Sequence, residues 1–147
     1  MKKIFYSAMA CAAMMLAGCE VNTSDNGKLD GFWQMTRVDT LITGGTTDMR
    51  DSLLFWSVQG PLLGVRDSHA DRHLAIFFNF KHEGGRLELF NPIADNRMIS
   101  DSVITCTATI SYTGVNSLRE TFDVKTLENE KMVLESEHHL RLHFRKY

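Results

Sequence analysis

Histidines and carboxylates that lie close together in the sequence are the first candidates for chemistry, because imidazole and carboxylate groups bind metals such as zinc. The chain has six histidines. Three residues separate His69 from His73, with Asp67 and Asp71 nearby. This spacing places two side chains together on a helix, whereas the local pattern predicts a polar loop followed by a strand. The sequence therefore predicts a solvated loop here and no metal site.

The remaining histidines are not expected to converge either. His138 and His139 fall in a predicted tight turn, and His143 alternates outward on the last strand, beside Arg141 and Arg145. We therefore expect no bound metal and no other cofactor.

Nucleophiles are also poorly placed for catalysis. Cys106 falls on the apolar face of a strand expected over residues 103–112, which predicts a buried thiol that packs as a small hydrophobic group. No serine lies in a Gly-x-Ser-x-Gly context, and no glycine-rich phosphate loop precedes a helix. The sequence predicts no catalytic residues, and we do not expect an enzyme.

The N-terminal residues carry an export signal. Two lysines precede an apolar stretch, residues 4–16, that is short for a bilayer-spanning helix. Residues 16–19, Leu-Ala-Gly-Cys, resemble the bacterial lipobox, in which cleavage precedes the cysteine and the thiol carries a diacylglyceryl group. We expect a signal peptide over residues 1–18 and lipidation of Cys19, which would anchor the protein to a membrane. An uncleaved anchor or an ordinary signal peptide is the alternative.

Residues 19–28 are polar with a single aliphatic side chain, so we expect the lipidated cysteine to be followed by a flexible tether that reaches about 30 Å. The formal net charge is −2. Lysines and arginines are scattered among acidic residues rather than gathered in a basic stripe, so nucleic acid is not an expected partner.

Short runs of β-branched and aromatic residues, separated by Gly, Asn, Asp or Pro, predict antiparallel strands from Leu29 onward. The expected strands are residues 32–38, 52–58, 62–66, 74–80, 86–90, 103–112, 120–126, 131–136 and 140–144. Eight or nine strands are enough for a sheet to close and lose its edges. We predict an all-β fold for residues 29–147: a small antiparallel meander barrel of about eight strands.

Two strand predictions depend on particular residues. Asn91 and Pro92 are expected to end the strand over residues 86–90, because proline has no N–H group for the ladder. Apolar and hydroxyl residues alternate along residues 103–112, which predicts the clearest strand of the chain.

The two ends of this domain resemble those of the lipocalin-like (calycin) barrels. Residues 29–33, Leu-Asp-Gly-Phe-Trp, resemble their Gly-x-Trp opening, and residues 140–147 resemble their arginine-bearing last strand. The resemblance implies that an arginine of the last strand lies across the first-strand tryptophan and closes the barrel floor. Trp33 and Arg145 are the expected pair.

The whole mature chain is similar to the small lipocalin-like lipoproteins common in Bacteroidetes. Surface-exported lipoproteins of that group carry an acidic cluster after the cysteine, whereas only Glu20 and Asp25 are acidic here. We therefore expect a cell-envelope lipoprotein of the outer membrane that faces the periplasm.

The inward faces of the expected strands provide candidates for ligand binding. They are Trp56, Phe78, Ile104, Ile110, Tyr112, Phe122, Leu134 and Leu142. The first functional hypothesis is a barrel that binds a small hydrophobic or amphipathic ligand in an internal pocket. The alternative is a structural or accessory lipoprotein whose barrel is filled by these same side chains and whose surface contacts an envelope protein.

Overall fold

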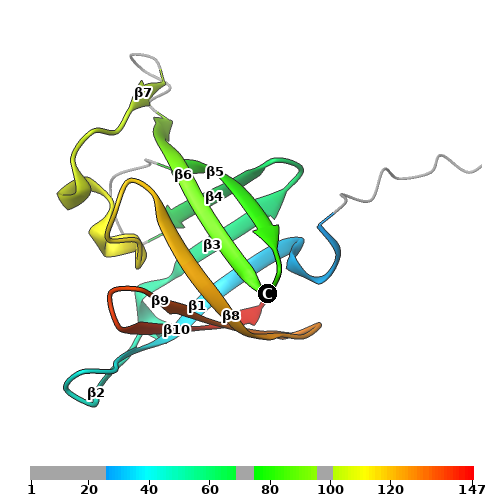
Figure 1. Cartoon of the computed structure of the whole chain (residues 1–147), viewed down its shortest axis with the longest axis vertical. Coiled ribbons are helices and arrows are strands. Elements are labelled where there is room, and N and C mark those ends of the chain that lie inside the picture. Colours follow the sequence, from blue (N-terminus) through cyan, green and yellow to red (C-terminus); the bar gives the residue numbers. More distant parts are fainter. Residues whose placement is uncertain (1–25, 69–74, 96–100) are drawn as a thin grey trace, which may run out of the picture.

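The computed structural model describes residues 26–68, 75–95 and 101–147, in which eight antiparallel strands close into a barrel (Figure 1). The barrel strands are β1 (Gly31–Thr40), β3 (Leu54–Gln59), β4 (Leu62–Asp67), β5 (Ala75–Glu83), β6 (Arg86–Asp95), β8 (Glu120–Leu127), β9 (Lys131–Ser136) and β10 (Leu140–Lys146). Successive barrel strands pair with each other, and β1 closes the sheet by pairing with β10. The predicted all-β meander barrel is confirmed.

Two short strands lie off the barrel path. Strand β2 (Gly45–Asp48) folds back on the end of β1, in the stretch between the strands expected over residues 32–38 and 52–58. Strand β7 (Ser102–Val103) pairs with the end of β6. The helical elements of the described chain are single 3-10 turns: η1 (Gly27–Leu29), η2 (Arg50–Ser52), η3 (Thr107–Thr109) and η4 (Ser111–Thr113).

Strand β6 does not end at Asn91 and Pro92, so that prediction was wrong. The register between β5 and β6 shifts between Phe77 and Asn79, which marks a β-bulge. A bulge leaves a residue out of the ladder, and proline, which has no N–H group, is tolerated there. The carbonyl of Pro92 still accepts a hydrogen bond from the N–H of Ile104 at 2.9 Å.

The strand predicted over residues 103–112 is also absent. Only Val103 belongs to a strand, and the chain continues through η3 and η4. Hydroxyl groups explain the difference, because Thr113 Oγ1 donates to the carbonyl of Ile110 at 2.6 Å and competes with ladder pairing. Cys106, expected to be buried on this strand, is exposed.

Candidate functional site

The inward side chains of the barrel strands meet in one core. Of the eight predicted ligand-binding residues, seven are buried; none of these is more than 7% exposed. They are Trp56, Phe78, Ile104, Ile110, Phe122, Leu134 and Leu142. The eighth, Tyr112, is 45% exposed, and its placement in the interior was wrong.

Trp56 lies at the centre of this core. Its ring centroid is 5.9 Å from that of Phe122 and 4.9 Å from that of Phe144. Its indole N–H donates to the carbonyl oxygen of Thr113 at 3.1 Å. The Trp56 side chain has no exposed surface, so it borders no space large enough for a water molecule. The polar end of the ring is satisfied by the chain itself rather than by a ligand.

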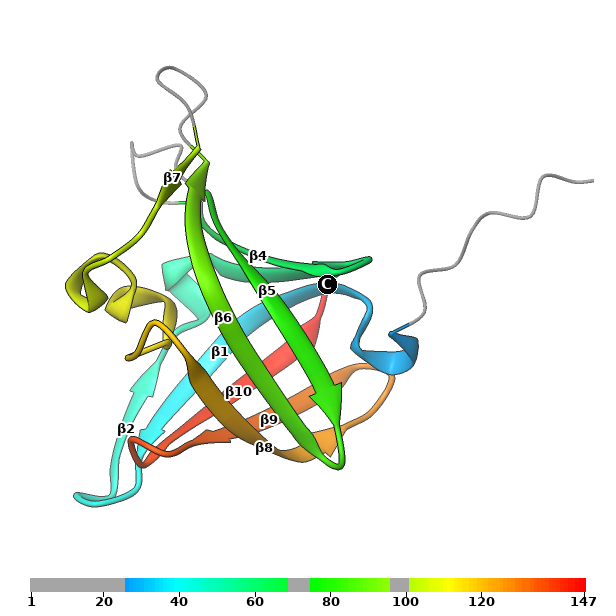
Figure 2. The same ribbon diagram turned by 45° about the horizontal axis from the view of Figure 1, so that its top comes forward.

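Residues 104–115, hereafter the covering segment, lead through η3 and η4. They cover the end of the barrel opposite η1 (Figure 2). The apolar residues Ile104, Ile110 and Val115 of this segment are buried against the core. Gly114 follows η4 with a φ of 89°, and a Cβ atom there would lie 3.0 Å from both Leu142 Cδ1 and Met35 Cε. The segment therefore packs so closely on the barrel wall that this position requires glycine.

The other end of the barrel is closed by Trp33. Its indole N–H donates to the carbonyl oxygen of Leu29 in η1 at 2.8 Å. The cation over its ring is Lys146, whose Nζ is 4.8 Å from the ring centroid. A Cβ atom at Gly31 would lie 2.6 Å from Lys146 Cε, so the glycine of the Gly-x-Trp sequence leaves room for this lysine.

Arg145, the predicted partner of Trp33, points the other way. Its side chain is exposed, and its Nε donates to Oε1 of Gln34 at 2.8 Å. Residues alternate in direction along a strand, so Lys146 shares the inward face with Leu142 and Phe144. A cation does close the floor, but Arg145 was the wrong residue.

A carboxylate missed by the sequence analysis lies in the core. Glu120, at the start of β8, is 2% exposed. Burial raises its pKa, although its Oε2 accepts hydrogen bonds from the backbone N–H groups of Asn116 and Ser117. Among the buried side-chain atoms described, Glu120 Oε1 and Asn116 Nδ2 have no hydrogen-bond partner. The carboxylate fixes the chain that leads from η4 into β8.

The outer face of the barrel has a different character. A groove of about 730 Å³, hereafter the outer groove, lies over β1, β2 and β10. It is lined by Thr36, Arg37, Thr46, Asp48, Arg50, Glu130, Lys131, His143, Phe144 and Arg145. Four of these side chains are cationic and two are acidic, in a chain whose formal net charge is −2.

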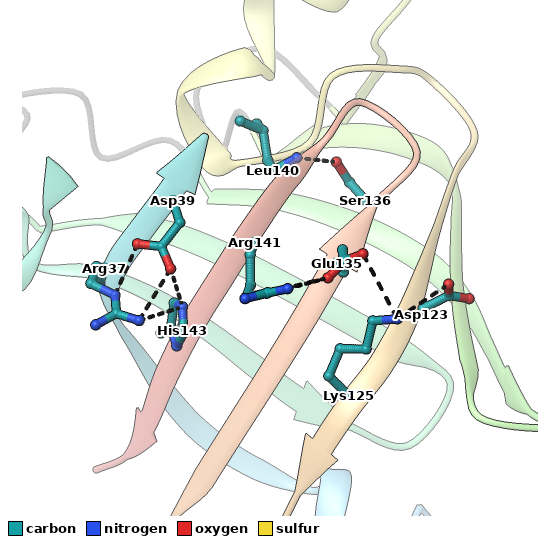
Figure 3. Close-up of polar contacts among 9 residues, drawn as sticks. All are labelled: Arg37, Asp39, Asp123, Lys125, Glu135, Ser136, Leu140, Arg141 and His143. Carbon is teal, nitrogen blue, oxygen red and sulfur yellow. Dashed lines mark hydrogen bonds and ion pairs between the residues drawn. The ribbon is translucent and has the colours of Figure 1, made fainter. Parts of the chain in front are cut away.

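On the wall of the groove, Arg37 and His143 form a polar cluster with Asp39 (Figure 3). Asp39 Oδ2 is 2.7 Å from His143 Nε2, and Asp39 Oδ1 is 3.0 Å from Arg37 Nε. Burial opposes ionisation of Asp39, but hydrogen bonds from His143 and Thr46 hold its pKa below the usual value.

A second set of ion pairs crosses β10, β9 and β8 (Figure 3). Glu135 Oε2 accepts from Arg141 Nη2 at 2.9 Å, and Lys125 Nζ lies between Glu135 and Asp123 at 3.7 and 3.9 Å. The hydrogen bond from Arg141 lowers the pKa of Glu135. These pairs are largely exposed, and such pairs add little to stability.

Comparison with known proteins identifies the family. A family model described as a lipocalin-like domain matches residues 14–147. The chain belongs to this lipocalin-like family. A search of curated proteins gave no match.

Solved structures share the barrel of this lipocalin-like protein. A lipocalin-like protein from Bacteroides uniformis is 22% identical, with a TM-score of 0.62 over 82% of this chain and 100% of that one. An uncharacterized protein from Bacteroides eggerthii is 16% identical, with a TM-score of 0.59 over 80% and 98% of the two chains. A protein from Burkholderia xenovorans is 11% identical, with a TM-score of 0.51 over 80% and 82%. At these identities the likeness concerns the fold alone.

Several predicted features fall outside the described residues: His69, His73, Asp71 and Cys19, together with residues 1–18 and 19–25. Within the described part of this lipocalin-like protein, no group of three or more His, Cys, Asp or Glu residues could hold a metal ion. No helix in the same residues is long and apolar enough to cross a membrane.

Proposed function

We propose that this protein is a membrane-anchored lipoprotein of the cell envelope, and that its filled barrel serves as a scaffold for contacts made by its outer face. The lipobox-like residues 16–19 support the anchor, and the periplasmic face of the outer membrane is the location that the sparse acidity of the tether favours. The family supports a role in binding rather than catalysis.

One observation carries the choice of a filled barrel. The side chains that would line an internal pocket are buried against one another, and the one indole N–H among them bonds the carbonyl of Thr113. An apolar pocket for a drug-sized ligand needs a volume of roughly 300 Å³ or more. The wall formed by Trp56, Phe122 and Leu134 offers no exposed surface to such a ligand.

Native mass spectrometry tests this proposal. A chain that begins at residue 20, and so keeps every described element, would be purified from a bacterial host and sprayed without denaturation. We expect the apo mass, and no rise in melting temperature across a panel of fatty acids and bile acids. A stoichiometric hydrophobic adduct would contradict a filled barrel.

A small hydrophobic ligand inside the barrel is the second candidate, and the covering segment favours it. In the described chain this segment has no long ladder with the barrel; it is held by hydrogen bonds such as Ile104 N–H to the Pro92 carbonyl and the Trp56 indole N–H to the Thr113 carbonyl. Displacement of the segment would uncover Trp56. An adduct that speeds hydrogen exchange of the Ile104 N–H and of the Trp56 indole N–H, whose hydrogen bonds join this segment to the barrel, would support this candidate.

The membrane anchor has its own test. A Cys19→Ser variant has no thiol to acylate, so we expect it in the soluble or unprocessed fraction, whereas the parent protein is expected in the outer-membrane fraction. Metabolic labelling with a clickable fatty acid checks the modification directly. Mature, lipid-bearing Cys19→Ser protein in membranes would contradict the anchor.

A further inference from the structure

Two cations on the outer face lie opposite each other without an acidic partner. Arg145 of β10 and Lys131 of β9 are direct cross-strand neighbours. Neither forms an ion pair with a carboxylate of the described residues. Like charges at directly opposed positions destabilise a sheet. This arrangement therefore costs folding stability in the absence of an anion.

Arg145 is also held in place. Its neighbour on β1 is Gln34, an outward side chain that is only 3% exposed because η2 covers it. Gln34 Oε1 accepts from Arg145 Nε at 2.8 Å, while Gln34 Nε2 donates to the carbonyl of Arg50 at 3.0 Å. A buried amide thus fixes the guanidinium through its Nε atom. Within the described chain, no group bonds the two Nη atoms, so they stay available to a ligand.

Most of the other charged side chains of the outer groove form ion pairs within the protein. Asp48 is bound by Arg50, which lowers the pKa of Asp48 to about 2. Arg37 is bound by Asp39, which lies beside the groove. The remaining acid is Glu130, the sequence neighbour of Lys131. It forms no ion pair with Arg145 or Lys131 in the described chain, so these two cations face an incoming ligand.

We propose that the outer groove binds a phosphate-type oxyanion between Arg145 and Lys131. The two Nη atoms of Arg145 suit two oxygens of a tetrahedral anion, and the ammonium of Lys131 supplies a second charge. The hydroxyl groups of Thr36 and Thr46 on the wall of the same groove already donate to the carbonyl of His143 and to Asp39 Oδ1, so the two cations carry the binding. The anion relieves the repulsion between the two cations, so binding is favoured by more than the contacts alone.

This inference rests on the proposal that binding takes place on the outer face, but its test is separate. Inorganic phosphate would be titrated into the chain that begins at residue 20, and the backbone amides and the arginine Nε–H groups would be followed by NMR. We expect saturable shifts at Arg145, Lys131 and Thr36. Arg145→Gln and Lys131→Gln should each weaken binding about tenfold, as expected for loss of one charge-assisted contact.

Arg86→Gln is the matched control. Arg86 is an exposed arginine that pairs with Asp123 at 3.5 Å and does not line the outer groove. This variant should bind phosphate as the parent does. Equal losses in all three variants would reveal screening of overall charge and overturn the proposal, as would a titration without saturable shifts.

The phosphate group could belong to a soluble ester or to a lipid headgroup. Flotation with phosphatidylglycerol vesicles, against phosphatidylcholine vesicles, separates the two sources. If the protein floats with phosphatidylglycerol vesicles and Arg145→Gln abolishes this binding, the site is assigned to a lipid headgroup. If phosphate causes the NMR shifts but the protein does not float with the vesicles, the site is assigned to a soluble ester. If phosphate fails to bind while native mass spectrometry still gives the apo mass, this inference falls and the filled barrel stands.

Discussion

The two faces of β10 differ in what holds them in place. Leu142 and Phe144 point inward and are buried, whereas Arg141, His143 and Arg145 point outward into polar contacts. Apolar burial contributes roughly 25 cal/mol per Å², while exposed ion pairs contribute about 0–1 kcal/mol. The inner face therefore provides the stability of the barrel. The outer face can carry charges that serve binding, because it contributes little to folding.

The sharpest test of this division compares two neighbours on β3. Trp56→Ala should lower the free energy of unfolding by about 3–5 kcal/mol, because it removes a fully buried ring and leaves the Thr113 carbonyl without its donor. Ser57→Ala, on the opposite face, should change it by less than about 1 kcal/mol. Urea denaturation measures both. Similar decreases in the free energy of unfolding for the two variants would contradict the claim that the inner face provides the stability of the barrel.

A second comparison isolates the packing of the covering segment. Gly114→Ala places a methyl group against Leu142 and Met35 and should cost about 2–4 kcal/mol of stability. Gly60→Ala has a similar positive φ of 57° but no atom within 4 Å of the new Cβ, so it should cost only the backbone strain of about 1–2 kcal/mol. Thermal unfolding followed by circular dichroism gives the difference. Equal costs would mean that the segment does not press on the wall.

Adjacent residues at the end of β10 test the closed end. Lys146→Ala should lower stability by about 0.5–1 kcal/mol, since the lysine lies over the Trp33 ring. Arg145→Ala should have a smaller net effect, because losing its hydrogen bond to Gln34 is offset by relief of the repulsion from Lys131. The melting temperatures of the two variants measure this difference, and an unchanged melting temperature for Lys146→Ala would contradict its role in closing this end.

The buried carboxylate predicts a pH effect that outer carboxylates lack. Because burial raises the pKa of Glu120, the folded protein binds this proton more tightly than the unfolded chain does. Stability should therefore fall as the pH rises from 4.5, the ordinary pKa of a glutamate, through the raised folded-state pKa. Glu120→Gln should flatten this part of the curve, measured by urea denaturation between pH 4 and pH 8. Parallel curves for the variant and its parent would contradict the raised pKa.

Much of the fold could be predicted because local patterns determine it. Residues 131–136, for example, were predicted as a strand and form β9 with the same bounds. Residues 103–112 alternate between apolar and hydroxyl side chains as a strand would, but hydroxyls that bond nearby carbonyls turn the chain into η3 and η4. Periodicity alone does not distinguish a ladder from such turns.

The candidate site depends on strand register, which the sequence shows less clearly. The closing cation could have been placed correctly, because Leu142 and Phe144 point inward and Lys146 continues their alternation. The outer groove could not be predicted from the sequence, since it forms only when β10 pairs with β1 and β2 folds back on β1. The burial of Glu120 likewise depends on the covering segment, which was predicted as a strand.

Quenching of tryptophan fluorescence tests the filled interior most directly. The chain has two tryptophans, Trp33 and Trp56, and both are 0% exposed, one at the closed end and one at the centre of the core. We expect blue-shifted emission that iodide does not quench and that added hydrophobic ligands do not change, with a denatured sample as the positive control. A fraction of the emission that is quenched by iodide and protected by a hydrophobic ligand would show an accessible pocket and contradict the filled barrel.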